Sequence, residues 1–274
     1  MLKIALVGAT GRMGTRVAEQ LLLAENAELI AVITHDDSAW VDKPYREVLL
    51  KHGVAVEAKS LRVSSDFTQL RQADVVIDFA TAQGIAKRVE FYAQLRKPIV
   101  LCTTGLNEST LASVKALSQE IPMVVAPNTS VGMNLLATLV ATASAAMGAD
   151  ADIEILEAHH TKKQDAPSGS AILLGEAAAQ ARGQQLKDVA AYDRNGQDEL
   201  HQKGSIGFAT IRGGDIVGEH TVFVIAGGER LELTHRVSSR NTFATGAIRA
   251  AHWVAGRPAG FYEMKDVLGL DEKR

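Results

Sequence analysis

The chain has 274 residues, of which 46% are hydrophobic and 22% are charged, a balance typical of a soluble α/β protein with one large or two modest domains. Its formal net charge of −3 gives no electrostatic reason to expect binding to nucleic acid or to an anionic membrane. The single cysteine, Cys102, excludes an intrachain disulfide, and no stretch approaches the roughly 20 apolar residues of a membrane span. We therefore expect a cytoplasmic globular protein.

The N-terminal half alternates apolar strands with helices. Near-continuous apolar runs predict strands at residues 3–7, 28–33, 73–80, 97–105 and 121–128. Helical spacing predicts a helix after the first strand and further helices over 84–96 and 107–119. Such alternation is typical of a parallel sheet covered on both faces. The polar segment 34–65 has weak periodicity, and we expect an extended loop there.

The pattern changes near residue 130. Helices are predicted over 134–148 and 170–183, with a strand at 152–160 between them. The segments "SIGFATIRGG", "DIVGEHTVFVIAGG" and "ERLELTHRVSS" then follow one another with only glycine-rich turns between them, which predicts an antiparallel meander. A last helix, over 243–256, is expected to pack back on the first domain.

These elements predict an α/β fold with two domains. The N-terminal domain, residues 1–129 plus 239–274, is expected to be a Rossmann-type doubly wound parallel sheet that binds a dinucleotide. The second domain, residues 130–238, is expected to be an inserted α+β domain.

The segment "GATGRMG" joins the first strand to the first helix and places glycines at Gly8, Gly11 and Gly14. Glycines at such a junction let the backbone turn tightly and approach a pyrophosphate, whose charge the N–H groups of the helix start can meet. This position in the chain predicts a nucleotide site, with Arg12 inside the turn and within reach of a phosphate.

The end of the second strand bears on the choice between NAD and NADP. An acidic residue there binds the ribose 2′-hydroxyl, whereas a neutral or basic set accommodates a 2′-phosphate. Thr34 is not acidic, and His35 with Arg12 can face a phosphate, although Asp36 and Asp37 can still bend back to a ribose. The sequence therefore leans slightly towards NADPH.

The stretch "EAHHTKKQDAPSGSA", residues 157–171, concentrates charge just before a helix start. Free N–H groups and serine hydroxyls at that start can bind a carboxylate, and a lysine nearby adds a positive charge. Histidine titrates near neutral pH and can give a proton to a carbanion or enamine as hydride arrives. Metal binding by His159 and His160 is disfavoured, because adjacent residues of an extended segment point in opposite directions. The stretch predicts a site for a small dianionic substrate.

The sequence resembles the 4-hydroxy-tetrahydrodipicolinate reductase (dihydrodipicolinate reductase) family almost from end to end. The matching segments are "VGATGRMG", "VIDFAT", "TTG", "APNTSVGMN", "IEILEAHHTKKQDAPSGSA", "IGFATIRGGDIVGEHTV" and "GERLELTHRVSSRNTFATGAIRAA". The resemblance implies a reductase of lysine and diaminopimelate biosynthesis. It would transfer hydride from NADPH or NADH to a cyclic unsaturated dicarboxylate, with net loss of water. It also implies a homotetramer assembled through the sheet of the second domain.

The resemblance also implies roles for individual residues. His159 would donate the proton, and Lys163 would assist as donor and substrate ligand. The substrate carboxylates would be held by His160, Lys163, Ser168, Gly169 and Ser170. No metal is implied. The cofactor would contact Gly8, Ala9, Thr10, Gly11, Arg12, Met13, Gly14, Thr34, His35, Cys102, Thr103, Thr104, Ala126, Pro127, Asn128 and Thr129.

Four positions depart from the family pattern. Cys102 stands where glycine is usual, and it adds a side chain where the backbone would approach the nicotinamide. Thr129 replaces a usual phenylalanine and removes an aromatic wall, so both changes bear on cofactor affinity. Ser170 replaces threonine but keeps the hydroxyl, and Thr34 stands where an acid is often found.

Two other functions fit parts of the sequence. One is another two-domain nicotinamide oxidoreductase, acting on a sugar or a semialdehyde. A semialdehyde dehydrogenase needs a cysteine nucleophile, and Cys102 has no neighbouring base in the sequence. The other is a nucleotide-sensing protein without catalysis. Such a protein would keep the glycine turn but would have no use for His159 and Lys163.

Overall fold

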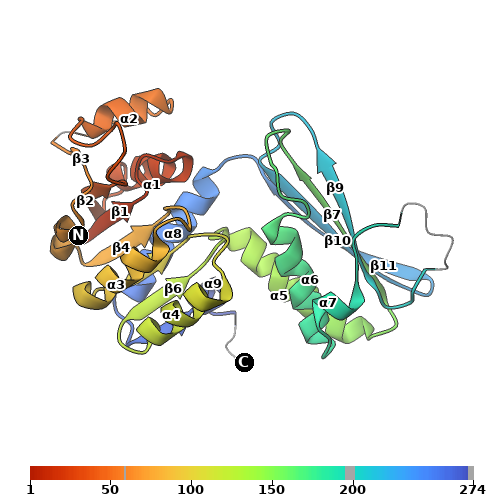
Figure 1. The fold of residues 1–274 in the computed structure, drawn as a ribbon. Coiled ribbons are helices and arrows are strands. Elements are labelled where there is room, and N and C mark those ends of the chain that lie inside the picture. Colours follow the sequence, from red (N-terminus) through yellow and green to blue (C-terminus); the bar gives the residue numbers. More distant parts are fainter. Residues whose placement is uncertain (59, 195–200, 271–274) are drawn as a thin grey trace. The chain divides into compact units, whose positions relative to one another are not determined.

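The computed structural model describes residues 1–58, 60–194 and 201–270 (Figure 1). The chain divides into two compact units. Unit 1 contains Met1–Val131 and Arg240–Arg274, and unit 2 contains Gly132–Ser239. The chain thus leaves unit 1, forms unit 2 and returns.

Among its described residues, unit 1 holds a seven-stranded sheet in the order β12-β6-β5-β4-β1-β2-β3, and all of its strand pairs are parallel. The strands are β1 (Leu2–Val7), β2 (Ala27–Ile33), β3 (Val63–Ser64), β4 (Val75–Asp78), β5 (Ile99–Leu101), β6 (Pro122–Val125) and β12 (Gly260–Tyr262). The predicted doubly wound parallel sheet is therefore confirmed. The sequence did not indicate β12.

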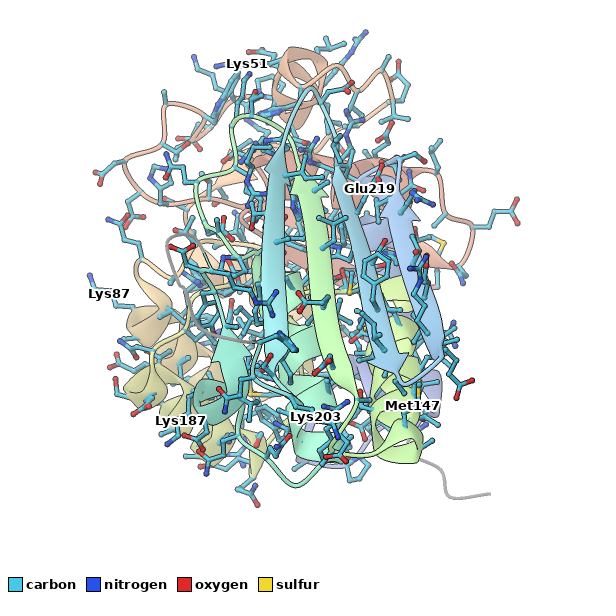
Figure 2. All side chains as sticks on the ribbon, turned by 90° about the vertical axis from the view of Figure 1, so that its right-hand side faces the viewer. Lys51, Lys87, Met147, Lys187, Lys203 and Glu219 are labelled. Atoms are coloured by element: carbon cyan, nitrogen blue, oxygen red, sulfur yellow. The ribbon has the colours of Figure 1, made fainter. Side chains whose placement is uncertain are left out.

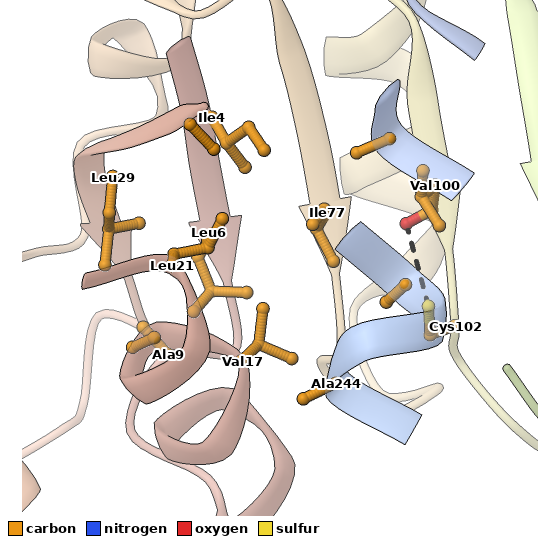
Figure 3. Packing of buried hydrophobic residues seen from close by; sticks show 14 of the residues in the cluster. Ile4, Leu6, Ala9, Val17, Leu21, Leu29, Ile77, Val100, Cys102 and Ala244 are labelled. Atoms are coloured by element: carbon orange, nitrogen blue, oxygen red, sulfur yellow. Dashed lines mark hydrogen bonds between the residues drawn. The ribbon is translucent and has the colours of Figure 1, made fainter. Parts of the chain in front are cut away.

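Helices cover both faces of this sheet, because its central strands are apolar on both sides. The helices are α1 (Arg12–Leu22), α2 (Tyr45–Lys51), α3 (Ile85–Leu95), α4 (Glu108–Ser118), α8 (Asn241–Val254) and α9 (Met264–Leu268), with a 3-10 turn at Phe67–Gln72. Ile4 and Leu6 pack on one face with residues of α1 and α8 (Figure 3). Ala5 and Val7 pack on the other face with residues of α3 and α4.

Two expectations for unit 1 have clear outcomes. The last helix, α8, lies against α1 and strands β4 to β6 of unit 1, as predicted. The extended loop expected over 34–65 is wrong, because this segment contains α2 and β3. Its periodicity is weak since α2 is short, yet Tyr45, Val48 and Leu49 are all buried on one side of it.

Unit 2 contains a five-stranded sheet among its described residues, in the order β11-β10-β7-β9-β8. The strands are β7 (Asp152–His159), β8 (Ala190–Ala191), β9 (Ile206–Arg212), β10 (Gly218–Ala226) and β11 (Glu229–Val237). One face is covered by α5 (Val131–Met147) and α6 (Gly169–Ala181), whose apolar side chains pack on Ile153 and Ile155; the short helix α7 (Leu186–Val189) follows α6.

The predicted meander in unit 2 is half right. Strands β10 and β11 form an antiparallel hairpin, as expected. Strand β9 does not pair with β10, however, because β7 lies between them and pairs with β9 in parallel. The crossover through α6 makes a parallel pair of β7 and β9 possible. The alternation of apolar residues indicates a strand but not its neighbour. No helix in the described part of the chain is long and apolar enough to cross a membrane.

Candidate active site

The glycine turn of unit 1 has a geometry that only glycine permits. Gly8 has a φ of +75°, and a Cβ there would lie 2.6 Å from the backbone nitrogen of Ala80. A Cβ on Gly14 would lie 2.2 Å from the carbonyl oxygen of Gly8. Gly11 begins α1 without a side-chain cap, and the first turn of α1 carries no acidic residue. The N–H groups at this helix start therefore suit an anionic ligand such as a pyrophosphate.

A cavity of about 530 Å³ opens beside this turn, within unit 1. Of the predicted cofactor residues, Gly8, Thr10, Gly11, Thr34 and His35 line it. The other predicted cofactor residues do not line the cavity. Four of them belong to the same turn or to the start of α1: Ala9, Arg12, Met13 and Gly14. The rest lie in the segments 102–104 and 126–129. The remaining lining residues were not predicted: Asp36, Ser65, Phe67, Phe79, Ala80, Thr81, Gln83, Gly84, Lys87, Arg88 and Phe91. Residues 79–81 directly follow β4, so the rule that ligands bind at the carboxyl ends of parallel strands could have found them.

A buried ion pair holds one wall of this cavity. The carboxylate of Asp78, which is fully buried, accepts hydrogen bonds from Arg88 Nε, the Tyr92 hydroxyl and the Ala80 N–H, each at 2.8 Å. The guanidinium of Arg88 also donates to the carbonyl oxygens of Thr81 and Gln83. Asp78 and Arg88 therefore both hold the loop between β4 and α3.

Several side chains after β5 and β6 make contacts within unit 1. The Cys102 side chain lies in the apolar cluster that Ile4 and Leu6 share, and burial raises the pKa of its thiol well above the usual range (Figure 3). Thr103 donates to the carbonyl oxygen of Ala80 at 2.9 Å, and Thr129 donates to the carbonyl oxygen of Phe243 at 2.6 Å. Asn128 accepts from the Ser130 N–H, Ala126 is buried, and Thr104 and Pro127 are exposed. The side chain that departs from the family pattern at Cys102 thus fills core space.

In unit 2, His159 lies at the end of β7 in a cluster of charged groups. Its Nδ1 is 2.6 Å from Oε2 of Glu157, two residues earlier on the same strand. Arg212, from β9, donates to both oxygens of Glu157 at 2.8 Å. The Ser168 N–H, at 3.1 Å, and the Thr210 hydroxyl, at 3.2 Å, also donate to Glu157. Alternation along β7 places Glu157 and His159 on one face, and the parallel β7–β9 pairing brings Arg212 to them.

The predicted helix start lies in the same cluster. Ser168 caps α6, because its hydroxyl accepts the Ala171 N–H at 3.1 Å. The same hydroxyl is 3.0 Å from Nε2 of His220, on β10, and the rings of His159 and His220 meet edge to face at 5.2 Å. The structure thus brings together His159 and Ser168 of the predicted set, through Glu157 and His220, which the sequence did not single out.

The other predicted substrate residues lie around this cluster. The Lys163 ammonium forms an ion pair with Asp165 at 2.8 Å, and it lowers the pKa of the nearby His159 imidazole. His160 is half-buried and its N–H donates to the carbonyl oxygen of Ile216. Ser170 is half-buried, and Gly169 is exposed in the first turn of α6. The neighbouring Lys162 is exposed.

Burial and charge set the protonation of this cluster. Burial would raise the pKa of Glu157, but hydrogen bonds from Arg212 and His159 outweigh it, and its pKa lies below the ordinary value. Burial lowers the pKa of His159, and the Glu157 carboxylate opposes that effect. Burial and the neighbouring His159 lower the pKa of His220 to about 3, so His220 is neutral near pH 7. Among the described residues no group of three or more His, Cys, Asp or Glu could hold a metal ion.

The two units together define a class of protein. A doubly wound sheet with a glycine turn is a fold that binds dinucleotides, and a histidine hydrogen-bonded to a carboxylate beside a helix start has the groups needed for proton transfer to an anionic ligand. The chain is thus a two-domain, nicotinamide-dependent oxidoreductase.

Comparison with known proteins gives the family. Residues 2–129 match the family model "Dihydrodipicolinate reductase, N-terminus", and residues 132–268 match "Dihydrodipicolinate reductase, C-terminus". The chain is 45% identical to the 4-hydroxy-tetrahydrodipicolinate reductase of Alkalilimnicola ehrlichii, over 98% of this chain and 99% of the relative. It is 42% identical to the reductase of the same name from Zymomonas mobilis, over 98% and 97% of the two chains. The chain belongs to the dihydrodipicolinate reductase family.

Solved structures support the fold. A dipicolinate-bound dihydrodipicolinate reductase from Paenisporosarcina sp. TG-14 superposes with a TM-score of 0.73 at 22% identity, over 96% of this chain and 97% of that one. An aspartate semialdehyde dehydrogenase from Vibrio cholerae gives a TM-score of 0.56 at 13% identity, over 99% of both chains. The same two-domain architecture thus occurs in oxidoreductases of other specificity.

Proposed function

We propose that the chain reduces 4-hydroxy-tetrahydrodipicolinate to tetrahydrodipicolinate, with net loss of water, in lysine and diaminopimelate biosynthesis. The observation that carries this proposal is the His159–Glu157 pair beside the capped start of α6, in a chain of the dihydrodipicolinate reductase family. In the balanced reaction one hydride and one proton enter the substrate and one water leaves. We expect the enzyme to work in the cytoplasm, where amino-acid biosynthesis takes place.

The residues of unit 2 would bind the dicarboxylate and supply the proton. The N–H groups at the start of α6, with the hydroxyl of Ser170, would bind one carboxylate, and His160 and Lys163 would bind and orient the other. His159, when protonated, would donate its proton to the carbon next to the one that accepts hydride. Lys163 lies close enough to influence the pKa of His159 and would assist this transfer.

The residues of unit 1 fit a dinucleotide cofactor. The turn at Gly8 and Gly11 would hold the pyrophosphate, and the cavity beside it would hold a ribose and a base. When bound, the nicotinamide supplies the hydride.

A preference for NADPH over NADH is part of the proposal. The Thr34 hydroxyl is 2.9 Å from that of Thr10, so the position usually held by an acid is instead bonded to the glycine turn. His35 and Lys87 line the same cavity and can face a 2′-phosphate, and Asp36 is the only acidic side chain in its lining among the described residues. A Lys87→Ala variant should raise the KM for NADPH more than the KM for NADH. Equal effects on both would contradict the preference.

The open face of the unit 2 sheet is the proposed tetramer surface. Figure 2 looks onto this face, which none of the helices in the described part of unit 2 covers. Leu156, Phe223 and Ile225 alternate with the residues that face the helices, and Ile211 on the same face is 47% exposed. Apolar side chains on an uncovered sheet favour association with a second copy. Light scattering should give the mass of four chains, and a Phe223→Glu variant should give a smaller mass.

The semialdehyde alternative requires a cysteine nucleophile. Cys102 is 4% exposed, lies in the core and has a raised pKa, so it is not a reactive thiol.

Substitutions in the proton donor site test the function. His159→Gln and Lys163→Ala should each lower kcat severely while NADPH binding, measured by titration calorimetry, is retained. Lys162→Ala is the matched control, because Lys162 is adjacent and exposed, and its kcat should stay near that of the parent. Near-parental rates for both His159→Gln and Lys163→Ala would show that the site is assigned wrongly.

A further inference from the structure

The Glu157 carboxylate accepts hydrogen bonds from three residues besides His159. The donors are the two Nη atoms of Arg212, the Ser168 N–H and the Thr210 hydroxyl, in addition to Nδ1 of His159. The side chain of Glu157 is 1% exposed, and its pKa is below the ordinary value despite that burial. Glu157 is therefore an ionised carboxylate, which has no proton to donate.

An ionised carboxylate 2.6 Å from a ring nitrogen fixes the tautomer of that ring. Nδ1 of His159 must carry a proton in both charge states, since its partner can only accept. The remaining nitrogen, Nε2, makes no hydrogen bond within the part of the chain that the structure describes, and it points to Gly218, where a Cβ would lie only 3.1 Å away. Nε2 is thus the nitrogen that gains and loses the titrating proton.

We propose that Glu157 is a positioning residue for proton transfer, which holds His159 with Nδ1 protonated so that Nε2 delivers the proton to the substrate. In this step the Nε2–H bond breaks and a C–H bond forms at the substrate carbon next to the one that accepts hydride. The imidazolium becomes neutral imidazole, and Glu157 remains a carboxylate throughout. This inference rests on the proposed reductase function.

Arg212 keeps Glu157 in this role. Its guanidinium donates to both carboxylate oxygens and also to the carbonyl oxygen of Asp165, at 2.7 Å. The same residue therefore ties the carboxylate to the loop that carries Lys163. The charged and titratable groups near His159 come from several elements: Glu157 on β7, Arg212 on β9, His220 on β10, and Lys163 in the loop before α6. Lys163 is itself paired with Asp165.

The net effect of these groups predicts a pH dependence. Burial, Lys163 and Arg212 disfavour the imidazolium of His159, and Glu157 favours it. Without the Glu157 charge, the pKa of His159 must fall further. Because the reaction needs protonated His159, kcat falls as pH rises through this pKa, and loss of Glu157 moves that fall to lower pH.

The test is Glu157→Gln, which keeps the shape of the side chain and removes its charge. We expect kcat at pH 7.5 to drop on the order of 10²-fold, with an alkaline limb of the kcat–pH profile displaced to lower pH. Glu154→Gln is the matched control, since Glu154 lies on the same strand and pairs with Arg194 at 2.6 Å but does not contact His159. Its profile should be that of the parent. An unchanged profile for Glu157→Gln, in an active parent enzyme, would overturn the inference but leave the function standing.

A second measurement needs no activity and no substitution at Glu157. In the parent protein, ¹⁵N shifts of the His159 ring, assigned by difference from His159→Gln, should show protonated Nδ1 and unprotonated Nε2 above its pKa. The opposite tautomer would refute the inference. If the parent protein shows this tautomer but does not reduce the substrate, the proposed function fails and the positioning of His159 does not.

Discussion

Replacement of Asp78 by alanine should strongly destabilise unit 1. Asp78 is fully buried and accepts three hydrogen bonds, one of them from the guanidinium of Arg88. Removing one partner of a buried ion pair leaves the other charge uncompensated and costs about 3–5 kcal/mol. The hydroxyl of Tyr92 loses its acceptor as well, but Arg88 retains the carbonyl oxygens of Thr81 and Gln83, which keeps the loss within this range.

Urea unfolding followed by tryptophan fluorescence measures this loss. The chain has two tryptophans, Trp40 and Trp253, and both belong to unit 1. With a slope of about 2 kcal/mol per molar urea, the midpoint of Asp78→Ala should fall by roughly 1.5–2.5 M. Affinity for NADPH should fall too, since Arg88 fixes the cavity wall.

The matched control is Glu120→Ala, which breaks the exposed pair with Arg96 and should cost less than about 1 kcal/mol. The double variant Asp78→Ala/Arg88→Ala should lose less than the sum of the two single variants, by more than about 1 kcal/mol. A single-variant loss of less than about 1 kcal/mol, or strict additivity, would refute the assignment of a buried ion pair.

Three further predictions concern single residues. Ser168→Ala removes the cap of α6 and should cost about 1 kcal/mol in urea unfolding while raising the KM for the dicarboxylate; an unchanged KM would argue against a carboxylate site there. Gly246→Val should abolish folding, measured as soluble yield and circular dichroism, because a Cβ at Gly246 would lie 1.8 Å from the carbonyl oxygen of Thr129; a stable variant would contradict this packing. The pKa of His220 is lowered from 6.5 to about 3 in the folded protein. As pH falls, the imidazole is protonated in the unfolded chain before it is protonated in the folded one, so the free energy of unfolding decreases between about pH 6.5 and 3. This group lowers the free energy of unfolding by up to about 1.4 kcal/mol per pH unit in that range. A His220→Gln variant should therefore lose less free energy of unfolding per pH unit on acidification, and a slope equal to that of the parent would contradict a buried neutral ring.

The sequence predicted what depends on local pattern. Strand β1 is apolar at every buried position. It is followed by Gly8, which has a positive φ that glycine adopts more readily than other residues. The strand, the turn and α1 could therefore be predicted together. Asn107 caps α4 and Ser168 caps α6, and both residues stand directly before a predicted helix or within two residues of its start.

The sequence did not predict what depends on pairing over distance. The neighbours of a strand are set by packing of whole elements, and β7 separates β9 from β10 although these are consecutive in the chain. The same register brings Arg212 and His220 to His159 from strands more than 50 residues away. Glu157 was visible two residues before His159, on the same face of the strand, but its role becomes evident only with Arg212 in place.

The central claim is that His159 is the proton donor of a dicarboxylate reductase. The most direct measurement is oxidation of NADPH and of NADH by the parent and by His159→Gln, with substrate generated by the preceding synthase. We expect the parent to turn over with a preference for NADPH, and His159→Gln to lose about 10²–10⁴-fold in kcat while it still binds NADPH. A His159→Gln enzyme that turns over within a few-fold of the parent would contradict the account.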